Sequence, residues 1–203
     1  QPFLERIGLD RSQDRGVRTG AARRIKNDAV FASMVVEEEP FYVGRPDETD
    51  QLWPRILRMT DQKAINQIAS SVNPPVSYLG LQQRAAEVLK DQAALAALVA
   101  NHPIAEVKRN AAKNLTDQAL LGPIVLRHPD PEVRVLAAHQ LTDQALVEEV
   151  LRRDDYLGVR TTAASRLTDP RRLNELSRDP NPQMRWAGGA HHRPSRNCSP
   201  GRE

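Results

Sequence analysis

The chain has 203 residues, of which 39% are hydrophobic and only 4% aromatic, and its formal net charge at pH 7 is +3. This composition favours one elongated domain packed by Leu, Val and Ala over a globule with a large centre. The sequence contains neither a run of about 18 apolar residues nor a charged-then-apolar leader, so we predict no membrane span, no signal peptide and a cytoplasmic location. The single cysteine, Cys198, excludes an internal disulfide framework.

Residues 1–30 are basic and end in a segment that returns near the other end of the chain. VRTGAARRIKND at 17–28 matches VRTTAASRLTDP at 159–170. This match predicts the second helix of a degenerate N-terminal repeat. We place Asp28 in the capping position that Asp169 holds, and we expect a further helix that begins near Asp28 and ends with Val36.

The segment 31–50 interrupts the pattern with six acidic residues and one basic residue, set among Pro40, Gly44 and Pro46. Charge blocks flanked by proline and glycine usually stay solvated, which favours a loop inserted between repeats. The alternative is an acidic arm that occupies a basic groove or a partner. Residues 1–50 therefore form one predicted region, a degenerate repeat followed by an acidic insertion.

The repeat returns with MTDQ at 59–62, a turn whose next copy is LKDQ at 89–92. This spacing is longer than the later ones, and NPPVSY at 73–78 accounts for the excess as a rigid turn between two helices. Trp53 and Tyr78 are the large aromatic residues here. We expect them to pack against the short repeats, although a ligand platform is the alternative.

Residues 81–185 repeat with a period of 26 residues. Each copy contains an aliphatic residue, two alanines that begin four residues later, and a leucine followed by a turn with aspartate. The alanine pairs are Ala85-Ala86, Ala111-Ala112, Ala137-Ala138 and Ala163-Ala164. Such periods indicate stacked repeats that bury each other's apolar faces. The small alanines allow the second helix of one repeat to lie close to the second helix of the next.

Two prolines show where the helices of each repeat begin. Pro170 follows Asp169 and Pro131 follows Asp130, and proline is favoured at the first helical position, directly after the capping residue. By register, three more aspartates cap helices: Asp91, Asp117 and Asp143. Period-two alternation is nowhere sustained, so strands are not expected. The sequence predicts an all-α fold, an α-solenoid of six or seven helical hairpins whose hand stays open.

Basic residues recur beside the buried aliphatic, at Lys108, Arg134, Arg160 and Arg185. Such a ladder could bind phosphates along a nucleic-acid strand. The structural alternative pairs each base with an acid of the preceding loop, and the candidate acids are Asp130, Asp154 and Asp179. We favour the structural pairing.

Two histidines, His102 and His128, share another register of the repeat. Neighbouring helices lie about 8–10 Å apart, whereas two imidazoles on one zinc ion each need a bond of about 2 Å. The same register holds Asp154 and Asp179 in later repeats, and these residues suit a turn. We therefore predict a turn role and no metal site.

The segments DPEVRVLAAHQLTDQAL at 130–146 and RDPNPQMR at 178–185 resemble the HEAT-like superfamily, in particular the leucine-rich-repeat-variant proteins of bacteria. The resemblance covers 81–190 well, and 17–30 and 51–80 weakly. It implies an α-solenoid used as a binding scaffold, with an Asp/Arg ladder that ties adjacent repeats. The leucine-rich-variant family is associated with an N-terminal iron–sulfur domain built on several cysteines. This chain offers only Cys198, near its other end, so no cofactor is predicted.

The repeat array is predicted to span 51–190 and to be followed by a polar tail, HHRPSRNCSPGRE, at 191–203. A glycine-rich phosphate loop, an HExxH motif and a nucleophile elbow are all missing from the sequence. We predict a non-catalytic scaffold that binds a protein or peptide partner along the face of the second helices, with no small-molecule substrate. The alternative is a nucleic-acid-binding solenoid, since the HEAT-like superfamily includes alkylpurine DNA glycosylases.

The residues two and six places after each buried aliphatic are expected to project from the second helices. They are Gln83 and Glu87, Arg109 and Lys113, Val135 and His139, Thr161 and Ser165. A groove that tracks a nucleic-acid strand would be basic in every repeat, whereas this set changes character from repeat to repeat. The predicted partner-binding residues are Arg109, Lys113, His139 and Arg166. Any nucleic-acid binding should be weak and lost near physiological salt.

Overall fold

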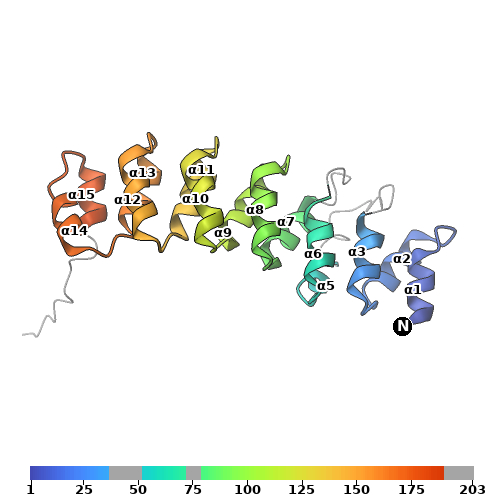
Figure 1. Cartoon of the computed structure of the whole chain (residues 1–203). Helices are drawn as coiled ribbons and strands as arrows, with labels where there is room; N and C mark the ends of the chain where they lie inside the picture. The colour runs from blue at the N-terminus through green and yellow to red at the C-terminus, as the bar shows by residue number, and fades with distance from the viewer. Residues whose placement is uncertain (37–51, 72–78, 190–203) are drawn as a thin grey trace, which may run out of the picture. The chain divides into compact units, whose positions relative to one another are not determined.

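The computed structural model describes residues 1–36, 52–71 and 79–189, and within these ranges all regular structure is helical. The chain divides into two compact units, Gln1–Leu115 and Thr116–Glu203. Within each unit the helices pack in consecutive pairs (Figure 1). The predicted all-α fold is confirmed. The division into two units falls inside the predicted repeat array 51–190.

The first unit consists of short helices in alternating first and second places. They are α1 (Pro2–Leu9) and α2 (Arg15–Ala22), α3 (Asp28–Val36) and α5 (Trp53–Ile56), α6 (Gln62–Ala69) and α7 (Leu79–Val88), and α8 (Gln92–Asn101) and α9 (Ala105–Asn114). First helices contact first helices, as α3 does α6, and second helices contact second helices, as α5 does α7. The acidic insertion and Tyr78 lie outside the described residues.

The described part of the second unit, residues 116–189, contains three hairpins. They are α10 (Gln118–Arg127) and α11 (Pro131–His139), α12 (Gln144–Arg153) and α13 (Leu157–Ala164), and α14 (Pro170–Leu176) and α15 (Pro182–Gly189). The second helices contact one another more extensively than the first helices do, α11 with α13 and α13 with α15. Both alanines of every pair are fully buried. The predicted close approach of neighbouring second helices is therefore confirmed.

The predicted helix caps are present. Asp91, Asp117, Asp143 and Asp169 each accept a hydrogen bond from a backbone N–H in the first turn of the following helix. Asp130 caps α11 in the same way, through the N–H of Glu132 at 2.9 Å. Each cap satisfies one of the backbone donors that a helix start leaves without an intrahelical partner.

A glutamine directly after the cap joins neighbouring hairpins, a role that the sequence analysis did not assign. Gln118 Oε1 accepts the N–H groups of Thr142 at 2.8 Å and Asp143 at 3.1 Å, and Nε2 donates to the carbonyl of Gln140 at 3.0 Å. Gln144 makes the corresponding contacts with the turn that follows α13. The glutamine thus satisfies backbone groups of the next turn, which must find partners when the hairpins stack.

Asp28 holds this joining position in the N-terminal repeat, and the capping position predicted for it is wrong. Its Oδ2 accepts the N–H groups of Thr60 at 2.7 Å and Asp61 at 2.9 Å. The side chain that caps α3 is Asn27. When the segments 17–28 and 159–170 are aligned without a gap, Asn27, and not Asp28, aligns with Asp169.

Arg55 supplies the donors that a carboxylate lacks at this joint. Its Nη2 lies 2.6 Å from Asp28 Oδ1 and donates to the carbonyl of Lys26 at 3.1 Å, and its Nε donates to the carbonyl of Ile25 at 2.7 Å. The ion pair is buried, with side-chain exposures of 7% and 10%. Burial raises the pKa of the Asp28 carboxyl, but the N–H groups of the next turn and the Arg55 guanidinium outweigh it and hold this pKa below its usual value.

Candidate partner-binding face

Each second helix presents one stripe of side chains to solvent, opposite its buried aliphatic residue. We call these stripes the second-helix face. In the first unit the face comprises Gln83, Glu87, Arg109 and Lys113, and in the second unit it comprises Val135, His139, Thr161, Ser165 and Trp186. All of these residues are half buried or exposed, whereas the aliphatics Val107, Val133 and Val159 are fully buried. The predicted outward positions are therefore in place.

Charged side chains on the second-helix face of the first unit are bound by neighbouring residues. Arg109 lies 2.5 Å from Glu106, one turn earlier on α9. Lys113 Nζ donates to Asn110 Oδ1 at 3.3 Å, and Asn110 Nδ2 donates in turn to Glu87 Oε1 at 3.2 Å on the neighbouring second helix. The charges on this face are thus partly neutralised within the unit.

Trp53 lies beside this face and is half buried. The guanidinium of Arg84 stands over its ring at 4.7 Å from the centroid, and the same guanidinium lies 2.9 Å from Glu87. A cation that covers an aromatic face in this way occupies the surface a ligand would stack on. The arrangement agrees with the packing role expected for Trp53.

The second-helix face of the second unit carries few charges. Thr161 and Thr162 on α13, and Ser165 directly after it, donate their hydroxyl protons to backbone carbonyls of this helix, at 3.1, 2.8 and 2.6 Å. Because these hydroxyls are satisfied internally, they add little polarity to the surface. Val135 on α11 is also half exposed there.

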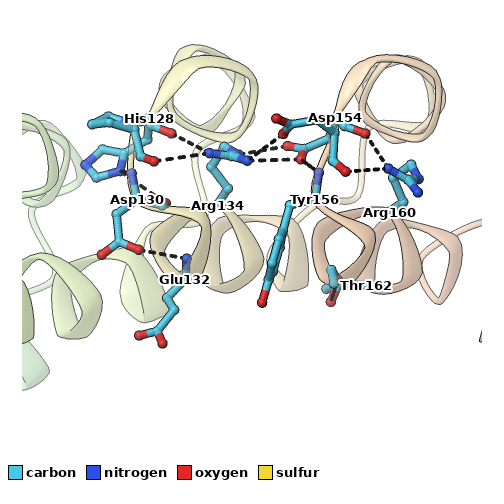
Figure 2. Close-up of polar contacts among 11 residues, drawn as sticks. His128, Asp130, Glu132, Arg134, Asp154, Tyr156, Arg160 and Thr162 are labelled. Carbon is cyan, nitrogen blue, oxygen red and sulfur yellow. Dashed lines mark hydrogen bonds and ion pairs between the residues drawn. The ribbon is translucent and has the colours of Figure 1, made fainter.

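Two aromatic side chains give the second unit its exposed apolar surface. Trp186 on α15 is 76% exposed, and Tyr156, which precedes α13, is 48% exposed. The Tyr156 ring lies between α11 and α13 (Figure 2), along Gly158, where a Cβ atom would stand 2.8 Å from its Cε1. Glycine at 158 therefore makes room for the ring. Tryptophan and tyrosine are enriched among the residues that contribute most to protein interfaces.

The loop edge of the second unit, where the second helices begin, carries an arginine ladder (Figure 2). Arg134 Nη1 donates to the carbonyls of His128 at 2.9 Å and Pro129 at 3.4 Å, while Nε and Nη2 bind the Asp154 carboxylate at 2.8 and 3.1 Å. The hydrogen bonds that Arg134 donates to the Asp154 carboxylate raise the pKa of the Arg134 guanidinium, although burial opposes this shift. Arg134 therefore links the loop before its helix to the loop of the next hairpin.

Contrary to the prediction, the acid that Arg134 binds does not come from the preceding loop. Asp154, which Arg134 binds, belongs to the following loop, and the preceding loop contributes backbone carbonyls. Arg160 repeats the contact with the preceding loop, because its Nη1 donates to the carbonyls of Asp154 at 2.8 Å and Asp155 at 2.9 Å. Arg185 donates to two carbonyls of its own preceding loop in the same way. The physical reason is that Arg134 engages both carboxylate oxygens of Asp154, one of which also accepts the N–H of Tyr156, so Arg160 bonds to backbone carbonyls of this loop.

The register shared by His102 and His128 serves the loop, as predicted. Each imidazole Nδ1 accepts the backbone N–H two residues later, at 3.2 and 3.1 Å. Asp154 and Asp179 accept the corresponding N–H with a carboxylate oxygen. Burial lowers the pKa of His102. Among the described residues, no three His, Cys, Asp or Glu side chains are placed to hold a metal ion.

The structure separates the four predicted partner-binding residues into two pairs. Arg109 and Lys113 lie one turn apart on α9 of the first unit. In the second unit, His139 is exposed at the end of α11, and Arg166 follows α13 and donates from Nε to the carbonyl of Leu141 at 3.1 Å. Arg166 thus also helps to join two hairpins. Partner binding by these four residues stays a prediction.

Sequence reasoning missed two exposed aromatic residues of the second unit, Trp186 on this face and Tyr156 in the loop before α13. Trp186 stands two places after Met184, the counterpart of Val159, so extending the outward register by one repeat identifies it. Tyr156 has no such signal, because it occupies a loop position and its ring lies along Gly158.

No family model, curated protein or solved structure matched this chain. None of the helices in the described ranges is long and apolar enough to cross a membrane.

Proposed function

We propose that this chain is a non-catalytic, HEAT-like α-solenoid scaffold that binds a protein or peptide partner along its second-helix face, chiefly in the second unit. The observation that carries the proposal is Trp186, a tryptophan with three quarters of its surface exposed on a face with few charges. Leaving so large an apolar side chain in water forgoes roughly 1.5–3 kcal/mol of burial free energy. A partner that covers it recovers this free energy.

Within each repeat, the residues that join the hairpins differ from those that face outward, and this separation supports a scaffold. The alanine pairs, the capping aspartates and the joining glutamines all contact their own repeat or the next one. The outward positions take no part in these three kinds of contact, and their chemistry changes from hairpin to hairpin. A surface that matches one irregular polypeptide has this character, because each repeat meets a different part of the partner.

The chemistry of the face favours a polypeptide over a nucleic acid. Sequence-independent binding to nucleic acid depends on many Lys and Arg contacts with phosphates. On the second-unit face, the outward residues are Val135, His139, Thr161, Ser165 and Trp186, none of which is a lysine or arginine. Apolar side chains and an aromatic anchor instead resemble the buried centre of a protein interface.

The test is affinity capture from an extract of the source cells, with nuclease treatment and about 150 mM salt. The wild-type chain is compared with Trp186→Ala and with Phe3→Ala, a matched control because Phe3 is 63% exposed in the first unit. We expect one polypeptide that the wild type and Phe3→Ala retain and Trp186→Ala loses. Tight binding of duplex or single-stranded nucleic acid at this salt, or release of bases from alkylated DNA, would instead support the glycosylase-like alternative.

A further inference from the structure

Arg134 shows what an arginine in the ladder register binds. One guanidinium nitrogen, Nη1, is held by carbonyls of the preceding loop. The other two, Nε and Nη2, present a pair of parallel donors that Asp154 fills with both carboxylate oxygens. This fork geometry selects planar anions, which accept two hydrogen bonds side by side.

Arg160 occupies the same register one hairpin later, but only half of its guanidinium is engaged. Nη1 donates to the carbonyls of Asp154 and Asp155, which holds the side chain in the same orientation as Arg134. Figure 2 shows these contacts on the side of Arg160 that faces Asp154. Within the described part of the chain, no hydrogen bond or ion pair reaches its Nε or Nη2.

The missing carboxylate is explained by the length of α14. Asp154 directly follows α12, which ends at Arg153. Its counterpart Asp179 lies three residues beyond the end of α14 at Leu176, and its Oδ1 accepts the N–H of Asn181 at 2.7 Å. Because the first helix of this hairpin is short, Asp179 does not form the ion pair that Asp154 forms with Arg134.

An open pocket of about 430 Å³ takes up the space beside Arg160. It is also lined by Arg152, Asp179 and Asn181. Two further acids line it, Glu148 and Glu175, but both are held by Arg172, which binds Glu148 through two hydrogen bonds at 2.8 and 2.9 Å. The lining thus carries three positive charges, from Arg152, Arg160 and Arg172, and three negative ones, from Glu148, Glu175 and Asp179, so its formal net charge is zero. Arg152 and Arg160 lie outside the cluster that Arg172 forms with the two glutamates.

We propose that this pocket binds a carboxylate group of a ligand, which takes at Arg160 the place that Asp154 takes at Arg134. Nε and Nη2 of Arg160 donate to its two oxygens, and Arg152 adds electrostatic attraction. The pocket lies at the loop edge of the second unit, between α12, α14 and the start of α15. The proposal is therefore independent of partner binding on the second-helix face.

The test follows the Nε–Hε resonances of arginine by NMR in the full-length chain labelled with ¹⁵N-arginine. Resonances are assigned with Arg134→Lys, Arg152→Lys and Arg160→Lys, and the probes are acetate, a blocked tripeptide with a central aspartate and inorganic phosphate, at constant ionic strength. We expect a saturable shift of the Arg160 resonance with both carboxylates, and a tighter response to the peptide would assign the ligand to a polypeptide. Arg152→Gln should weaken the response, and Arg160→Gln should abolish carboxylate binding.

Arg134 provides the internal control. In the wild type its resonance should not respond, because Asp154 already fills its fork. In Asp154→Asn, which keeps an acceptor for the N–H of Tyr156, acetate should move Arg134. If Arg134 responds in that variant while Arg160 does not respond in the wild type, the proposal is wrong. A response to phosphate alone, equal shifts at all exposed arginines, or a shift of Arg160 caused by Asp179→Asn without any probe would also overturn it.

Discussion

The two units bury the same residue types and expose different ones. Both pack their second helices through fully buried alanine pairs, such as Ala111-Ala112 in the first unit and Ala137-Ala138 in the second. On the outward side, the first unit presents interacting charges around Arg109, whereas the second presents Trp186 and few charges. The comparison shows that a repeat can keep its packing positions constant while its outward positions acquire separate chemistry.

The joints between hairpins differ as well. The second unit uses glutamine at Gln118 and Gln144, an uncharged side chain that both accepts and donates. At one joint of the first unit, Asp28 accepts the N–H groups of the next turn as Gln118 does, and its ion-pair partner Arg55 donates to the carbonyl of Lys26 as Gln118 does to that of Thr116. Two charges thus do at one joint what one amide does at the others.

The largest expected effect concerns this ion pair. Arg55→Ala leaves the Asp28 carboxylate buried without its cation and should cost roughly 3–5 kcal/mol of unfolding free energy. Arg55 occupies the register of the first alanine in later repeats. The double variant Asp28→Gln with Arg55→Ala therefore recreates the joint of the second unit and should recover much of the loss. Urea unfolding of both variants measures this, and a double variant as unstable as Arg55→Ala would contradict the equivalence of the two joints.

The alanine pairs provide the next test. Ala111→Leu and Ala137→Leu each force extra volume between second helices and should each lose about 1–3 kcal/mol. The matched control is Ala145→Leu, the same substitution at an exposed position of α12, which should change stability little. Thermal unfolding of the three variants checks the register. Equal melting temperatures for Ala137→Leu and Ala145→Leu would show that the second helices do not stack through this residue.

These features also show how far the sequence predicts the fold. The alanine pairs and the capping aspartates follow from periodicity, because stacking and capping depend on residues within one repeat. The joining role of Gln118 was missed, since it depends on backbone groups of the next repeat. Asp28 was misplaced by one residue, and the acid held by Arg134 was sought in the wrong loop. Contacts between repeats depend on how the hairpins stack, which the period alone does not specify.

The sequence predicted which positions of the second helices face outward, but it did not identify the two exposed aromatic residues. The outward register correctly includes Arg109, Lys113 and His139, which the structure places at the surface or half buried. The exposure of Trp186 could have been predicted by applying the same register to the last hairpin. Tyr156 could not, because its place depends on the absence of a side chain at Gly158.

Smaller losses are expected from the helix caps of the second unit. Asp117→Ala and Asp143→Ala each remove an acceptor for backbone N–H groups and should cost about 0.5–2 kcal/mol. Because the two caps serve different helices, their losses should add in the double variant. Urea unfolding of the single and double variants provides the comparison. A double variant no less stable than either single variant would argue against two independent helix starts.

The smallest effect is a pH dependence specific to the first unit. His102 has a lowered pKa in the folded chain, so the unfolded chain binds its proton more tightly. The contribution of His102 to the free energy of unfolding is therefore complete above about pH 6.5, the ordinary pKa of histidine, and decreases as the pH falls below this value. His102→Asp introduces the carboxylate acceptor that Asp154 provides in the same register, and it should remove the contribution of His102 to the pH dependence. Urea unfolding at pH 7.5, 6.5 and 5.5 should show a steeper decline for the wild type, and parallel declines would exclude His102 as the cause.

The central claim is that partner recognition resides on the second-helix face of the second unit. Isothermal titration calorimetry of the captured partner tests it directly, with the wild type, Trp186→Ala and the double variant Arg109→Glu with Lys113→Glu, at about 150 mM salt. Binding should survive this salt. Truncating an interface anchor worth about 2 kcal/mol or more should weaken binding about 30-fold or more in Trp186→Ala, and the charge-reversal variant should weaken it less. Unchanged affinity in Trp186→Ala, or a larger loss in the charge-reversal variant, would contradict the claim.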